Sequence, residues 1–127
     1  MLQFDSAYNR NKIELGVERR IVAEREAAEL RRYRQMHEVD INVELVRFYG
    51  NADAGFRGIQ EAALRAIIHG DEAFVLAIMP TGGGKSLLFM LPAAASRDGV
   101  TIVIVPMVAL QQDMCERGNE KGIPCAE

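Results

Sequence analysis

A glycine-rich segment between two apolar runs limits what this chain can fold into. Residues 79–86, Met-Pro-Thr-Gly-Gly-Gly-Lys-Ser, follow the run 73–78 and precede the run 87–91. Glycines let backbone N–H groups crowd around phosphate oxygens at φ values that side chains resist. A helix that begins beside them adds free N–H groups and a positive dipole end. The order strand, glycine loop, Lys-Ser and helix therefore predicts a phosphate-binding loop.

The loop departs from the usual pattern G-x-x-x-x-G-K-[ST], because Met79 stands where the first Gly is expected. Lys85 is predicted to act as the catalytic cation on the outer phosphates, and the Ser86 hydroxyl to bind Mg²⁺. A triple-Gly turn that binds no nucleotide is the alternative interpretation. The apolar runs on both sides favour the nucleotide site.

Composition sets wider bounds on the kind of protein. With 127 residues the chain amounts to one ordinary domain or less, and its 49% hydrophobic content is typical of globular proteins. A net charge of −3 favours neither nucleic acid nor membrane globally. The two cysteines, Cys115 and Cys125, are too few for a zinc site. No signal peptide and no apolar run of membrane length is recognised, so an intracellular protein is expected.

A charged segment occupies the N-terminal third. Residues 12–38 contain no Pro, are rich in Glu, Arg, Ala and Leu, and predict a helix, while residues 1–11 are expected to be irregular. Seven basic and seven acidic residues balance between Lys12 and Asp40. A solvated helix is the first interpretation, and a helix that binds a partner or a second copy is the alternative. The cluster 31–34, Arg-Arg-Tyr-Arg, fits either a phosphate contact or a charged helix face.

Turn-forming residues divide the chain in two. Residues 40–49 half alternate between polar and apolar, and residues 50–55, Gly-Asn-Ala-Asp-Ala-Gly, interrupt any regular element. We therefore predict a charged helical N-terminal extension over 1–50 and a separate domain over 51–127.

Residues 51–127 predict an α/β fold with parallel strands and crossover helices. Helices are expected at 59–69, at 85–95 (shortened or kinked by Pro92) and at 107–117, where Gly118-Asn119 should end the last one. Strands are expected at 73–79 and 100–105, and the tail 122–127 should approach a third. Parallel strands need cover on both faces, so two strands and a third approach predict an incomplete domain.

The motif order resembles a known family. Gln60 begins a predicted helix upstream of the loop, and a Gln amide can donate to and accept from adenine at once. Together with residues 56–60, Phe-Arg-x-x-Gln, the loop and residues 103–114 resemble the RecQ family of superfamily 2 DNA helicases over 48–127. Residues 86–93 look especially like the RecQ-like helicases of fungal telomere-linked and mobile elements.

The resemblance implies the first part of a RecA-like ATP-binding domain and assigns roles. Its parent function would be ATP-dependent 3′–5′ DNA unwinding in DNA recombination and repair, in the nucleus of a eukaryote. Adenine would be held by Phe56, Arg57 and Gln60. The phosphates of Mg²⁺-ATP would be held by Thr81, Gly82, Gly83, Gly84, Lys85 and Ser86. DNA would be contacted by Pro106, Met107, Ala109 and Leu110, although a plain strand-to-helix connection is an equal alternative for these four residues.

Hydrolysis needs more than these residues. A second strand ending in Asp-Glu should hold Mg²⁺ and orient the attacking water, and a second domain should supply an arginine finger. Asp98 precedes its predicted strand, and Asp113 lies within a predicted helix. We therefore expect an ATP-binding fragment of a RecQ-like helicase that is inactive alone. The alternatives are a non-catalytic nucleotide- or nucleic-acid-binding or helical interaction protein derived from a helicase, and a different P-loop ATPase.

Overall fold

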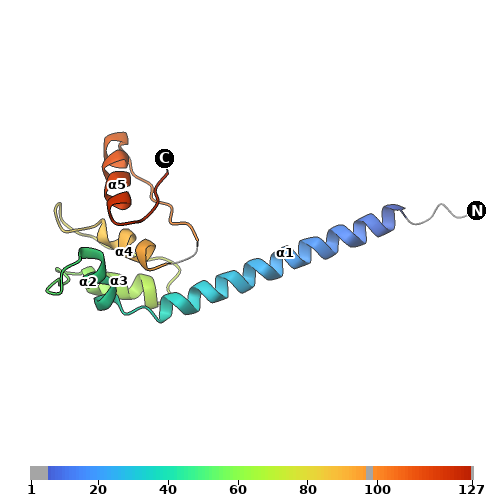
Figure 1. Ribbon diagram of the computed structural model, residues 1–127, viewed down its shortest axis with the longest axis horizontal. Coiled ribbons are helices and arrows are strands. Elements are labelled where there is room, and N and C mark those ends of the chain that lie inside the picture. The colour runs from blue at the N-terminus through green and yellow to red at the C-terminus, as the bar shows by residue number, and fades with distance from the viewer. Residues whose placement is uncertain (1–5, 97–98, 127) are drawn as a thin grey trace, which may run out of the picture. The chain divides into compact units, whose positions relative to one another are not determined.

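The computed structural model describes residues 6–96 and 99–126, which form helices joined by turns and irregular segments. The chain divides into two compact units, Met1–Arg34 and Gln35–Glu127, and each is described by itself. The helices labelled in Figure 1 are α1 (Ser6–His37), α2 (Ile41–Tyr49), α3 (Gln60–His69), α4 (Leu87–Ala95) and α5 (Val108–Glu120).

Helix α1 is a single uninterrupted helix of 32 residues (Figure 1). The prediction of a helix over 12–38 is confirmed, but residues 6–11, expected to be irregular, are helical as well. Residues 1–5 lie outside the described residues. Strong helix formers dominate the segment, and its apolar side chains are spread around the helix rather than gathered on one side.

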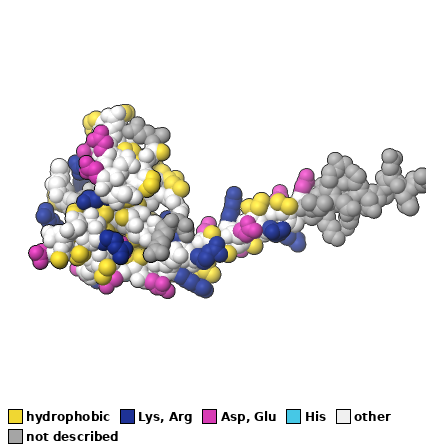
Figure 2. Space-filling view, viewed as in Figure 1, with side chains coloured by type: hydrophobic (Ala, Val, Ile, Leu, Met, Phe, Trp, Pro, Cys, Tyr) yellow, Lys and Arg dark blue, Asp and Glu magenta, His cyan; other side chains and the backbone are white. Residues whose placement is uncertain are grey.

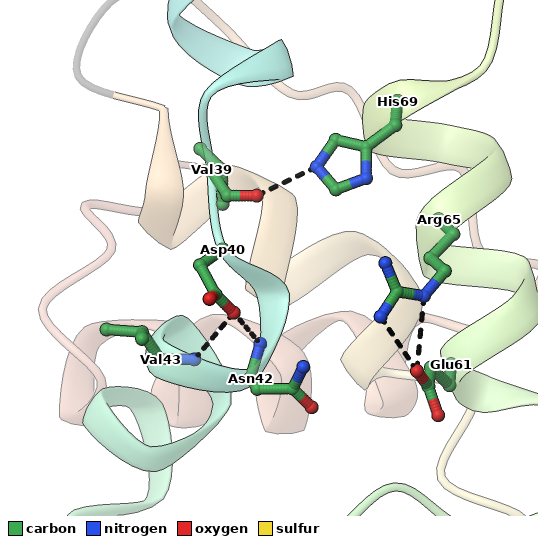
Figure 3. Close-up of polar contacts among 7 residues, drawn as sticks. All are labelled: Val39, Asp40, Asn42, Val43, Glu61, Arg65 and His69. Carbon is green, nitrogen blue, oxygen red and sulfur yellow. Dashed lines mark hydrogen bonds and ion pairs between the residues drawn. The ribbon is translucent and has the colours of Figure 1, made fainter.

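Helix α2 has defined ends. The carboxylate of Asp40 accepts hydrogen bonds from the backbone N–H groups of Asn42, at 2.9 Å, and Val43, at 3.3 Å (Figure 3). This N-cap satisfies N–H groups that have no partner inside the helix. The helix ends at Gly50, whose φ of 63° lies in the left-handed region that glycine adopts without strain.

Three short helices build the hydrophobic core of the second unit. Helices α2, α3 and α4 contact one another, and their fully buried side chains form one cluster: Ile41, Leu45, Leu64, Ile68, Leu87 and Leu91. A hydrogen bond from His69 Nε2 to the carbonyl oxygen of Val39, at 2.8 Å, ties the end of α3 to the start of α2 (Figure 3). Helix α2 therefore packs with residues beyond the predicted division at 50/51, and that division itself stays a prediction.

The α/β prediction is wrong, because residues 6–96 and 99–126 contain no strand. Residues 73–79 and 100–105 are irregular and form no ladder with each other or with other described residues. Most of their apolar side chains are exposed, with Leu76 81% exposed and Ile104 92% exposed, whereas Met79 is buried. A strand is stable only when its N–H and C=O groups pair with a neighbour and its apolar face is covered. A β-branched composition supplies neither of these.

The other predicted helices are present, but one of them ends at a different residue from the one predicted. The helix at 59–69 is confirmed by α3, and the helix at 85–95 by α4, which begins at Leu87 and continues three residues beyond Pro92. Helix α5 does not end at Gly118-Asn119 but runs to Glu120. Gly118 is buried, and a Cβ there would lie 2.7 Å from the Cys125 sulfur, so the absent side chain makes room for the tail. Residues 123–126 form no third strand.

Candidate nucleotide-binding loop

The segment 79–86 forms a tight glycine turn. The Gly83 N–H donates to the Pro80 carbonyl at 3.1 Å, and Gly82 and Gly84 have φ values of 78° and 76°. These angles lie in the left-handed region, where a Cβ is strained, so the turn depends on glycine at both positions. Met79, which replaces the expected first glycine, is buried. The loop is therefore anchored by an apolar side chain where the usual pattern has none.

The loop leads directly into α4. The N–H groups of Leu87 and Leu88 donate to the carbonyls of Gly84 and Lys85, at 3.1 and 3.0 Å. Ser86 stands at the N-cap, but its hydroxyl makes no capping hydrogen bond. Within the part of the chain that the structure describes, the N–H groups of Gly82, Gly84, Lys85 and Ser86 donate to no acceptor. Four unpaired N–H groups over five residues are what an anion site requires.

Polar side chains of the loop are free to bind a ligand. Lys85 is exposed and makes no ion pair with any described residue. Thr81 is exposed and Ser86 half-buried, and neither hydroxyl makes a hydrogen bond to the described residues. One ammonium, two hydroxyls and the unpaired N–H groups fit the phosphates and Mg²⁺ of a nucleotide. The donor set at the loop is therefore compatible with Mg²⁺-ATP.

Gln60 is joined to the loop across 23 and 24 residues of sequence. Its side chain is 3% exposed, and its Nε2 donates to the carbonyl oxygens of Gly83, at 3.2 Å, and Gly84, at 3.3 Å. Its Oε1 accepts from the Arg57 N–H at 2.8 Å. A Cβ on Gly84 would lie 2.3 Å from Nε2. Position 84 therefore requires glycine for two reasons: its positive φ and its close approach to the Gln60 amide.

The structure brings together only part of the predicted adenine site. Both ends of the Gln60 amide are bonded to backbone groups, Phe56 packs against the hydrophobic core, and Arg57 is exposed. The assignment of these residues to adenine stays a prediction. Sequence reasoning missed the carbonyl oxygens of Gly83 and Gly84 as partners of Gln60. No sequence signal identifies such a contact, because backbone acceptors exist at every residue.

The predicted DNA-contacting residues lie at the start of α5. Met107 is the N-cap residue and, like Pro106, Ala109 and Leu110, it is exposed. No hydrogen bond or ion pair joins these four residues to the loop within the described part of the chain. Their role in DNA contact stays a prediction.

Other kinds of site find little support among the described residues. No group of three His, Cys, Asp or Glu side chains among the described residues is placed to hold a metal ion. Cys115 and Cys125 form no disulfide within the described part of the chain. No described helix combines the length and apolarity needed to cross a membrane.

Comparison with known proteins identifies the class. A glycine loop with unpaired N–H groups at a helix N-terminus defines a candidate nucleotide-binding protein, and residues 57–126 match the DEAD/DEAH box helicase family. Because the match covers more than half of the chain, the chain belongs to this family. The loop and Gln60 both fall within the matched residues.

Relatives narrow the resemblance to RecQ-like DNA helicases. The chain is 47% identical over 72 residues to the ATP-dependent helicase SGS1 of Saccharomyces cerevisiae, covering 54% of this chain and 5% of that protein. It is 46% identical over 74 residues to the ATP-dependent DNA helicase hus2/rqh1 of Schizosaccharomyces pombe, covering 55% and 5%. It is 40% identical over 68 residues to the ATP-dependent DNA helicase RecQ of Haemophilus influenzae, covering 54% and 10%.

The chain thus spans a tenth or less of the length of these three relatives. No solved structure matches the chain. The resemblance to the RecQ family inferred from residues 56–60, 79–86 and 103–114 is confirmed by the relatives, and the fragment interpretation agrees with the coverage.

Proposed function

We propose that residues 80–86 bind the phosphates of Mg²⁺-ATP within the N-terminal portion of a RecQ-like helicase ATP-binding domain over 51–127, preceded by a helical extension over 1–50. The observation that carries the proposal is the set of four unpaired N–H groups at Gly82, Gly84, Lys85 and Ser86. The exposed, unpaired ammonium of Lys85 adds the positive charge that phosphates require.

Each residue of the proposed site has a distinct role. The unpaired N–H groups of Gly82, Gly84, Lys85 and Ser86 surround phosphate oxygens, while Gly83 shapes the turn through its bond to Pro80. The Lys85 ammonium neutralises the outer phosphates, and the hydroxyls of Thr81 and Ser86 complete the site. The Ser86 hydroxyl would hold Mg²⁺, which would supply positive charge to the phosphates. On the base side, Phe56, Arg57 and Gln60 are assigned to adenine.

For the parent protein we propose ATP-dependent 3′–5′ DNA unwinding. The relatives SGS1, hus2/rqh1 and RecQ are named as ATP-dependent helicases, the last two as DNA helicases, and they support this assignment. The exposed residues Pro106, Met107, Ala109 and Leu110 are assigned to the DNA strand. Their side chains donate no hydrogen bonds, Pro106 has no backbone N–H, and the Leu110 N–H donates to the Met107 carbonyl at 3.1 Å. The backbone N–H groups of Met107 and Ala109 are therefore the ones that would contact phosphate.

Calorimetry of ATP binding tests the site. Wild-type chain is expected to bind ATP in the presence of Mg²⁺ and weakly without it, and Lys85→Ala is expected to lose most of that affinity. Lys121→Ala is the matched control, because Lys121 is also an exposed lysine but lies over the rings of Phe48 and Tyr49, away from the loop in sequence. Equal ATP affinity in Lys85→Ala and Lys121→Ala would refute the assignment.

A non-catalytic interaction protein derived from a helicase is the second candidate. One observation favours it: both the nitrogen and the oxygen of the Gln60 amide are already hydrogen-bonded within the protein. If this candidate holds, wild-type chain binds neither ATP nor inorganic tripolyphosphate in the same calorimetric experiment. The two candidates therefore predict opposite results from one measurement.

A further inference from the structure

Four arginines line one side of α1. At about 100° per residue, Arg19, Arg20, Arg31 and Arg34 fall within a sector of about 120° of the helix. With a rise of about 1.5 Å per residue, they extend over about 22 Å of helix length. All four side chains are exposed. We call this set the arginine face.

The acidic residues of α1 lie outside the arginine face. Glu14, Glu18, Glu26 and Glu29 occupy a second sector of about 120°, and Glu24 and Glu26 each lie about 20° beyond an edge of the arginine face without entering it. Arg25 and Arg32 lie on the acidic side, beside those glutamates. Figure 2 shows charges of both signs along the described part of α1. The even balance of charge in the sequence therefore conceals a separation of charge around the helix.

The arginine face forms no ion pair with the described residues. Arg20 and Glu24 in α1 have the spacing for one, as do Arg34 and Glu38, but neither pair forms. Elsewhere in the described chain, ion pairs one helical turn apart do form, at Glu61 and Arg65 and at Asp113 and Arg117. The basic residue comes first in the α1 pair and second in the other two, and the basic-first order is the weaker one. Four guanidinium groups are thus available to an external anion.

Helix α1 is poorly suited to pair with a second copy of the chain. Pairing of helices needs an apolar seam at every third or fourth residue. The best seam runs through Leu15, Val22 and Tyr33, but Arg19, Glu26 and Glu29 occupy the seam positions between them. A rod of regularly spaced negative charge needs no such seam. Nucleic acid is such a rod, and arginine binds phosphate with paired hydrogen bonds.

We propose that the arginine face of α1 binds the phosphate backbone of a nucleic acid. The face lies outside residues 57–126, which match the helicase family, so this contact is separate from the one assigned to residues 106–110. It positions the nucleic acid without selecting sequence, because phosphates carry no base information. Its affinity comes from the release of condensed counter-ions.

Two double variants of equal charge test the proposal. Arg19→Gln with Arg34→Gln removes two charges from the arginine face, and Arg25→Gln with Arg32→Gln removes two from the acidic side. Gln and Arg have similar helix propensity, so circular dichroism should show the same helix content in both. Binding of a fluorescent DNA duplex is measured by anisotropy at several salt concentrations, and repeated with a single strand of the same sequence.

On the duplex, log K falls as log salt rises, and this fall is expected to be shallower for the arginine-face variant. The magnitude of the slope should decrease by about 2 units, since each phosphate contact contributes about 0.9. The control variant should keep the wild-type slope. Equal losses in both variants would show that only net charge matters, and unchanged slopes in both would show that the face is not used. Sedimentation in which the arginine-face variant alone dissociates an oligomer would assign the face to a second copy. Each of these three results overturns the proposal.

The test is independent of the nucleotide site. Both double variants keep residues 80–86 intact and are expected to bind ATP as wild type does. Failure of ATP binding in all forms would refute the loop assignment and leave the salt dependence of DNA binding as a separate result.

Discussion

The side-chain amide nitrogen of Gln60 donates to the carbonyl oxygen of Gly84 at 3.3 Å, and Gly84 is the one loop glycine where a Cβ would collide with that amide. The pair joins the first residue of α3 to the residue before Lys85. Because the amide is buried, its hydrogen bonds are not exchanged readily for water. Gln60 therefore fixes the shape of the loop whether or not it also contacts a base.

Substituting Gln60 separates these two roles. Gln60→Ala removes the bonds to Gly83 and Gly84 and is expected to weaken binding of ATP and of inorganic tripolyphosphate alike, by roughly tenfold, because two net hydrogen bonds are lost. Calorimetry with each ligand measures both affinities. Gln112→Ala, at an exposed Gln of α5, is the control. If the tripolyphosphate affinity stays unchanged while the ATP affinity falls, Gln60 contacts the base and does not support the phosphate loop.

The two positive-φ glycines of the loop provide a matched pair. Gly82→Ala and Gly84→Ala incur the same left-handed strain, about 1–2 kcal/mol, because both φ values lie near 77°. Only at position 84 would the new Cβ also meet Gln60, whereas at position 82 it would meet nothing within 4 Å. Urea unfolding is therefore expected to show a larger loss of stability for Gly84→Ala. Equal losses would mean that Gln60 does not contact the loop in solution.

The helical core makes a quantitative prediction. Leu64 is 0% exposed, and Leu64→Ala is expected to reduce the free energy of unfolding by about 2–5 kcal/mol through lost burial and the cavity it leaves. Leu76→Ala, the same change at an exposed side chain of residues 73–79, should alter it by less than about 0.5 kcal/mol. Denaturant titration of both variants checks the contrast. A large cost at Leu76 would place that segment in a buried environment instead.

Catalytic turnover by these 127 residues is expected to be negligible. Phosphoryl transfer needs a carboxylate that holds Mg²⁺ and a group that orients water. Asp113 is not available for this, because it lies in α5 and pairs with Arg117 at 3.0 Å. A coupled assay for released phosphate measures the rate, with Lys85→Ala as the control for contamination. ATP turnover of about 1 per second that disappears in Lys85→Ala would contradict the expectation.

Local signals in the sequence predicted local structure well. The sequence predicts helices at 59–69, 85–95 and 107–117, and the structure has α3, α4 and α5 there, with α4 beginning at Leu87 and α5 at Val108. Each of these segments has helix-forming residues that need only short-range hydrogen bonds. The break expected at Gly118 failed, since burial against Cys125 outweighs the low helix propensity of glycine there. The half-alternating residues 40–49 gave no clear period, yet the Asp40 cap and the Leu45 side chain make them helical.

The sequence by itself determined the chemistry of the loop: three glycines, an ammonium and a hydroxyl in the order that phosphate binding requires, within the motif order of RecQ-like helicases. It could not determine whether residues 73–79 and 100–105 become strands, because a strand is completed by a neighbour rather than by its own residues. Only the tertiary structure decided that these segments stay unpaired. It likewise decided that α2, α3 and α4 share one core and that the Gln60 amide is bonded to the loop, because long-range packing sets all three.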